Sequence, residues 1–104
     1  AIQEATLFAI EIPLKVMEIS YDSMEVIKAM AEIGNPNSVS DAGVGALCAR
    51  SAVMGAFMNV RINASGYDDK IFVAEVLNRG REIENKTIAL EAEILKIIDG
   101  KLGN

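Results

Sequence analysis

The sequence contains no histidine, no tryptophan, one cysteine (Cys48) and two prolines among its 104 residues. Without histidine, the commonest general base and the commonest metal ligand are both missing. This excludes a Ser-His-Asp triad and leaves too few ligands for a structural zinc site, so we predict no metal site. A single cysteine excludes an internal disulfide, and we therefore expect a protein of the reducing cytoplasm.

Basic residues are also scarce. Ten Lys and Arg face fifteen Asp and Glu, which gives a formal net charge of -5 and a pI near 4.6. No basic stripe is present to neutralise phosphates, so the composition argues against nucleic acid as a partner. It equally argues against an anionic membrane surface, and no apolar run reaches the roughly 20 residues that span a bilayer. We expect no membrane partner.

Hydrophobic residues make up 51% of the chain, although only three Phe and two Tyr are aromatic. Ala, Ile, Met, Leu and Glu dominate, which favours helix over sheet. The length suits one domain with one core, and no linker or low-complexity segment divides it. We predict a single all-helical domain over residues 1–104.

The first predicted helix covers residues 2–33. Its apolar positions alternate in steps of three and four, which is the pattern of a heptad seam, and only Ser23 is polar. Pro13 lies inside this helix; because the seam keeps its phase there, we predict a kink in one helix, with two helices meeting near Pro13 as the alternative. The seam consists of Ile2, Ala5, Ala9, Ile12, Val16, Ile19, Ser23, Val26, Met30 and Ile33.

Two turn-rich stretches separate this helix from two more. Gly34 ends the first helix, Ser40 or Asp41 caps a second over 41–63, and Asp68 or Asp69 opens a third that runs to about residue 99. The connections are short, so consecutive helices should be antiparallel, as part of a helical bundle. The third helix repeats apolar residues at seven-residue steps: Val76, Ile83, Leu90 and Ile97.

One face of the second predicted helix, which we call the bare stripe, carries no large side chain. All its members are small or polar: Asp41, Gly45, Cys48, Ala52, Gly55, Ala56, Asn59 and Asn63. In structural terms, Asp41 is a helix cap, the Gly and Ala residues allow close helix packing, Cys48 is a small core residue, and the two Asn fix register or end the helix. In functional terms, the stripe forms the floor of a cleft in which the side-chain amides of the two Asn hydrogen-bond to a planar heterocycle.

Three stretches in this order resemble the formiminotetrahydrofolate cyclodeaminase / methenyltetrahydrofolate cyclohydrolase family. They are IPL at 12–14, GNPNSVSD at 34–41 with its small-residue continuation, and GAFMNVRIN at 55–63. The resemblance implies an all-helical homodimer that binds a folate between long helices. It implies closure of 5-formimidoyl-tetrahydrofolate to 5,10-methenyl-tetrahydrofolate with release of ammonia, or, in the cyclohydrolases, opening of the methenyl ring by water. The tetrahydrofolate derivative is the substrate, and no cofactor is implied.

The resemblance also assigns residues. Ser40 and Asp41 match the family's SD, and Asn59 and Asn63 match its NV-IN, so these four are expected to bind substrate. Family members are about twice as long, and their first half carries a Pro-Gly-Gly-Gly-Ser-type stretch and an acidic proton shuttle. This chain has neither, so the catalytic residue is unknown and a missing N-terminal half is an expected partner. A non-catalytic helical module that dimerises or binds a partner helix is the alternative of another class.

Overall fold

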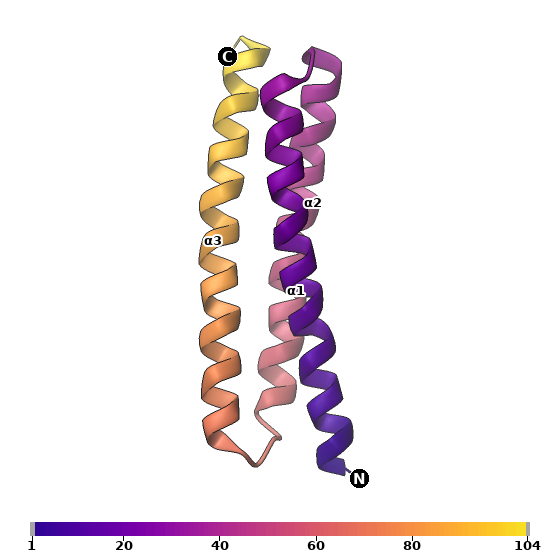
Figure 1. Ribbon diagram of the computed structural model, residues 1–104, viewed down its shortest axis with the longest axis vertical. Helices are drawn as coiled ribbons and strands as arrows, with labels where there is room; N and C mark the ends of the chain where they lie inside the picture. The colour runs from indigo at the N-terminus through magenta and orange to yellow at the C-terminus, as the bar shows by residue number, and fades with distance from the viewer. Residues whose placement is uncertain (1, 104) are drawn as a thin grey trace.

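A computed structural model describes residues 2–103 and shows three long α-helices side by side (Figure 1). They are α1 (Ile2–Ile33), α2 (Pro36–Ala64) and α3 (Lys70–Leu102). The helices run up, down and up along a rod of 54 × 19 × 16 Å, and each contacts the other two. The predicted all-α class and the antiparallel order of consecutive helices are confirmed.

The connection between α1 and α2 is shorter than predicted. The side chain of Asn35 accepts hydrogen bonds from the backbone N–H groups of Asn37 (3.0 Å) and Ser38 (3.1 Å), so Asn35 is the cap and α2 starts at Pro36. The predicted cap at Ser40 or Asp41 is therefore wrong. Proline at the first helical position suits this start, because its missing N–H would have no helical partner there.

Pro13 lies within a helix that continues unbroken from Ile2 to Ile33, which excludes two helices meeting at this proline. The face of α1 that packs inside the chain differs from the predicted one. The buried residues are Ile10, Met17, Met24 and Ala31, seven apart, whereas the predicted seam is largely exposed. The helix carries two apolar stripes, and the larger aliphatic side chains are on the stripe that the chain leaves uncovered.

The core is continuous along the other two helices. Phe57 of α2 is fully buried against Gly80 of α3, where an added Cβ would lie 2.4 Å from the ring. Three predicted positions of α3, Val76, Ile83 and Leu90, are buried. This helix continues past its predicted end to Leu102; there Gly103 terminates it in the left-handed conformation, with φ 79°.

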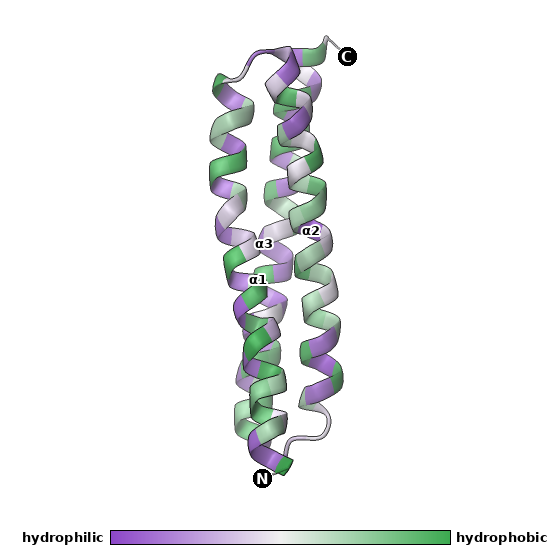
Figure 2. Ribbon diagram, turned by 90° about the vertical axis from the view of Figure 1, so that its right-hand side faces the viewer, coloured by the Kyte–Doolittle hydropathy of each residue, from purple (hydrophilic) through white to green (hydrophobic). Residues whose placement is uncertain are grey.

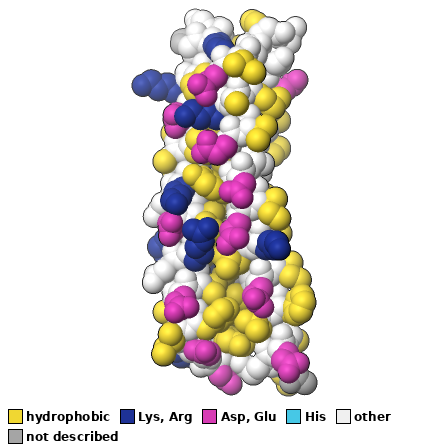
Figure 3. Space-filling model, viewed as in Figure 1, with side chains coloured by type: hydrophobic (Ala, Val, Ile, Leu, Met, Phe, Trp, Pro, Cys, Tyr) yellow, Lys and Arg dark blue, Asp and Glu magenta, His cyan; other side chains and the backbone are white. Residues whose placement is uncertain are grey.

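The surface is large for a chain of this size, and many large hydrophobic residues are exposed on it. The accessible area is 6204 Å², whereas a compact monomer of this mass exposes about 5,700 Å². Hydrophobic residues occur along the whole length of the rod (Figure 2), and some of them are at the surface on the right-hand edge of Figure 3, over α1 and α2.

By length and composition alone, α2 could cross a membrane, with a mean hydropathy of 1.3 over 18 residues. This is weak evidence, because the core helix of a soluble protein passes the same test. Many of the apolar residues of α2 face α1 and α3 in the core.

Candidate functional site

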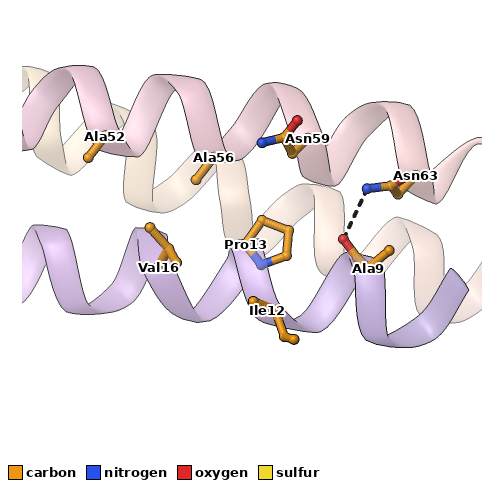
Figure 4. Close-up of a pocket in the computed structure, with 8 residues that line it drawn as sticks. All are labelled: Ala9, Ile12, Pro13, Val16, Ala52, Ala56, Asn59 and Asn63. Carbon is orange, nitrogen blue, oxygen red and sulfur yellow. Dashed lines mark hydrogen bonds between the residues drawn. The ribbon is translucent and has the colours of Figure 1, made fainter. Parts of the chain in front are cut away.

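A groove of about 450 Å³ lies between α1 and α2, with α3 behind it (Figure 4). Its volume is within the range of ligand pockets in proteins. One wall comes from α1 and the other from the bare stripe of α2. The lining residues are Ala9, Ile12, Pro13, Val16, Ala52, Ala56, Asn59 and Asn63.

Pro13 and Asn63 together shape one end of this groove. Proline has no backbone N–H, so the carbonyl of Ala9, four residues earlier, loses its helical donor. The side-chain Nδ2 of Asn63 donates a hydrogen bond of 3.0 Å to that carbonyl oxygen, as Figure 4 shows. Asn63 therefore joins α2 to α1 at the proline, while its Oδ1 makes no hydrogen bond to another described side chain or backbone group.

Asn59 lies one helical turn before Asn63 on the same wall and is exposed. Within residues 2–103 its amide forms no hydrogen bond, so one donor group and one acceptor are free to meet a ligand. The structure thus brings Asn59 and Asn63 together, as their spacing of four predicts.

Ser40 and Asp41 are at the opposite end of α2 and are both exposed. Ser40 donates its hydroxyl hydrogen to the carbonyl of Asn37 at 3.2 Å. Eighteen residues of helix separate Asp41 from Asn59, which is roughly 27 Å. Within one chain, these two members of the predicted site therefore do not share a groove with the two asparagines.

The bare stripe is exposed for much of its length, and one expectation for it is wrong. Cys48, predicted as a small core residue, is exposed, because the core of α2 lies on the neighbouring face that carries Val53 and Phe57. Sequence reasoning did not identify Ile12 and Val16 as a wall of the groove. Both residues belong to the predicted seam of α1, but the spacing of a seam does not show which residues or ligands pack against it.

The charged groups lie away from the groove. Lys28 of α1 pairs with Glu93 of α3 at 2.7 Å, and the hydrogen bond and charge of Glu93 raise the pKa of Lys28. Among residues 2–103 no group of His, Cys, Asp and Glu side chains is arranged to hold a metal ion. The groove therefore offers apolar surface and two amides, which can bind and orient a flat heterocycle but cannot transfer a proton.

Residues 1–82 match the sequence model of the formiminotransferase-cyclodeaminase family, and the chain belongs to that family. The family expected from the three motifs is thereby confirmed.

The curated relatives that match the chain include a protein named as a cyclohydrolase and proteins named as cyclodeaminases. A methenyltetrahydrofolate cyclohydrolase of Methylorubrum extorquens is 34% identical over 101 residues, which cover 97% of this chain and 49% of the relative. A formimidoyltransferase-cyclodeaminase of Dictyostelium discoideum is 33% identical over 97% of this chain and 19% of its own length. The corresponding Rattus norvegicus protein is 32% identical over 79 residues. The chain thus spans about half the length of the cyclohydrolase and a smaller share of the larger proteins.

Proposed function

We propose that this chain is part of a cytoplasmic folate enzyme and that the groove between α1 and α2 holds the tetrahydrofolate derivative. The reaction is closure of 5-formimidoyl-tetrahydrofolate to 5,10-methenyl-tetrahydrofolate with release of ammonia. The observation that supports this best is the pair of asparagines in an otherwise apolar groove, in a chain whose family members carry these activities by name.

The residues of the groove have separate tasks in this proposal. Ile12 and Val16 pack against the flat face of the ring, and the free amide of Asn59 meets its donor and acceptor edge. In the reaction, a folate N–H nitrogen attacks the formimidoyl carbon and its proton passes to the imine nitrogen; the resulting tetrahedral carbon expels ammonia once that nitrogen gains one further proton. No acidic or basic side chain lines the groove, so we propose that this proton comes from residues outside these 104, such as the N-terminal half that the relatives' length suggests.

Cyclohydrolysis of 5,10-methenyl-tetrahydrofolate is the second candidate. The relative from Methylorubrum extorquens that supports it is named for this reaction. Both reactions share the methenyl compound and a tetrahedral carbon between two nitrogens, so the same groove serves either. The identities of 34% and 33% differ too little to separate them.

A non-catalytic helical module is the candidate from another class. It is favoured by the exposed seam of α1, where Ile12, Ile19 and Val26 are each more than half exposed. In this case the groove is packing surface for a partner helix and has no affinity for folate.

Calorimetric titration of the chain with 5-formyl-tetrahydrofolate, a stable analogue, tests the proposal. We expect binding that Asn59→Ala weakens about tenfold, because one hydrogen bond of roughly 1.4 kcal/mol is lost. Asn78→Ala, a matched change at an exposed position of α3, should leave the affinity unchanged. Absence of binding, or equal effects of both variants, would contradict a folate site in the groove. A catalytic assay separates the two reactions. Release of ammonia from 5-formimidoyl-tetrahydrofolate identifies the cyclodeaminase, and consumption of 5,10-methenyl-tetrahydrofolate identifies the cyclohydrolase.

A further inference from the structure

The hydrogen bond between Asn63 and Ala9 fixes the orientation of the Asn63 side-chain amide. Its Nδ2 lies 3.0 Å from the carbonyl oxygen of Ala9 (Figure 4), and a carbonyl oxygen can only accept a hydrogen bond. Turning the amide over would place Oδ1 against this oxygen, so that two acceptors face each other. Pro13 makes this lock possible, because proline has no backbone N–H to donate to the same carbonyl.

A locked amide offers a ligand less than a free amide does. Asn63 lines the groove and is half-buried, and its donor atom is already occupied within the chain. Oδ1, an acceptor, is therefore the polar side-chain atom that Asn63 has left for a ligand. Asn59, whose amide is free within residues 2–103, can present either its donor or its acceptor.

We propose that the locked acceptor of Asn63 makes the groove selective for a reduced pteridine ring, with Pro13 as the positioning residue. This inference rests on the proposed function. In tetrahydrofolate derivatives the 8-nitrogen of the ring carries a hydrogen and can donate it. In folic acid the same nitrogen has a lone pair and no hydrogen. Oδ1 of Asn63 accepts a hydrogen bond from the reduced ring and faces another acceptor in the oxidised one.

The two asparagines then match two different parts of the ring. The pyrimidine edge of a pteridine carries donors and acceptors side by side, and the free amide of Asn59 can meet both kinds. The 8-nitrogen of a reduced ring presents a single donor, which suits the single acceptor of Asn63. Both candidate substrates, the 5-formimidoyl and the 5,10-methenyl compounds, keep this hydrogen, because their one-carbon groups are attached to other nitrogens.

The composition of the groove makes this contact selective. A site that hydrogen-bonds an N–H group rejects an analogue without that group, because a polar atom of the site is left unpaired. Apart from the two asparagines, the groove is lined by apolar side chains. None of these can donate a hydrogen bond to Oδ1 of Asn63 in place of the ligand.

Calorimetric titration of the 104-residue chain with three ligands tests the selectivity. In 5-formyl-tetrahydrofolate and 7,8-dihydrofolate the 8-nitrogen carries a hydrogen, and in folic acid it does not. We expect both reduced ligands to bind at least about tenfold more tightly than folic acid, because with folic acid one hydrogen bond is missing and one acceptor is unpaired. Pro13→Ala should bring this ratio of affinities close to one. Its new backbone N–H takes over the Ala9 carbonyl, and the amide of Asn63 is free to turn its donor to the ligand.

A second substitution separates this role of Pro13 from a structural one. In the Pro13→Ala background, Asn63→Asp should restore the preference for the reduced ligands, because an ionised carboxylate accepts hydrogen bonds and donates none. Pro13 also lines the groove, so the ratio of affinities, and not either affinity alone, is the readout. Asn59→Ala is the matched control. It should weaken all three ligands and leave the ratio unchanged, since the amide of Asn59 is not locked.

Three results would overturn the selectivity and leave the folate site standing: equal binding of all three ligands by the wild type, a ratio that Pro13→Ala does not change, or a double variant that does not regain the preference. Absence of binding by every ligand would overturn the proposed function and this inference with it. Helical circular dichroism of each variant checks that the ratios are compared between folded proteins.

Discussion

The hydrogen bond from Asn63 to the carbonyl of Ala9 makes a prediction that links two helices. Removing the amide in Asn63→Ala leaves a partly buried carbonyl without a donor, which should cost about 1 kcal/mol of unfolding free energy. For a chain of this size, that corresponds to a melting temperature lower by roughly 4–8 °C. Asn78→Ala, an exposed position on α3, is the matched control and should change the melting temperature little.

Pro13 supplies the second half of the test. Pro13→Ala restores a backbone N–H at residue 13, and this group can donate to the Ala9 carbonyl as in any α-helix. In that background Asn63→Ala should cost less than half of what it costs beside proline. Urea denaturation of the four proteins of this double-mutant cycle measures the coupling, at one protein concentration so that any self-association weighs equally. Equal costs of Asn63→Ala in both backgrounds would refute the idea that Asn63 compensates for the proline.

Further predictions concern the core and its charges. Gly80→Ala should lower stability by about 1–3 kcal/mol, because the new Cβ would lie 2.4 Å from the ring of Phe57 and one of them must shift. Gly100→Ala, where an added Cβ meets nothing within 4 Å, should raise the melting temperature through up to about 1 kcal/mol of helix propensity; a loss there would show that the site is not open. Glu91→Met should stabilise by about 1 kcal/mol in denaturant titrations, since Oε2 of Glu91 is buried without a hydrogen bond and Arg50 approaches the other oxygen only to 3.5 Å. Destabilisation by Glu91→Met would indicate that the Arg50 pair contributes more than its geometry suggests.

Periodicity was enough to predict the first and third helices, because each repeats apolar residues over four or more turns, whereas the second helix was predicted from the capping and turn residues at its ends. It placed Val76, Ile83 and Leu90 correctly in the core, since α3 has a single strong apolar stripe. It failed on α1 because that helix carries two such stripes. Hydrophobicity ranks the exposed stripe with Ile12 and Ile19 above the buried one with Met17 and Met24. Only the positions of the neighbouring helices decide between them.

Local rules failed where two signals overlapped. Asn35 and Asp41 are both good capping residues. Pro36, which follows Asn35, is a turn former but also suits the first helical position. For the candidate site, the spacing of Asn59 and Asn63 predicted their common face. The bond of Asn63 to Ala9 could not be predicted, because it depends on the register between α1 and α2, which a single sequence does not specify.

The two short connections have a consequence for how fast the three helices fold into the rod. Gly34 and Asn35 alone separate α1 from α2, and five residues, 65–69, separate α2 from α3. Helical hairpins with such connections make most contacts between residues close in sequence, and bundles of this kind fold in about microseconds to milliseconds. Refolding should therefore show a fast unimolecular phase that forms the rod, with a rate that does not change with protein concentration.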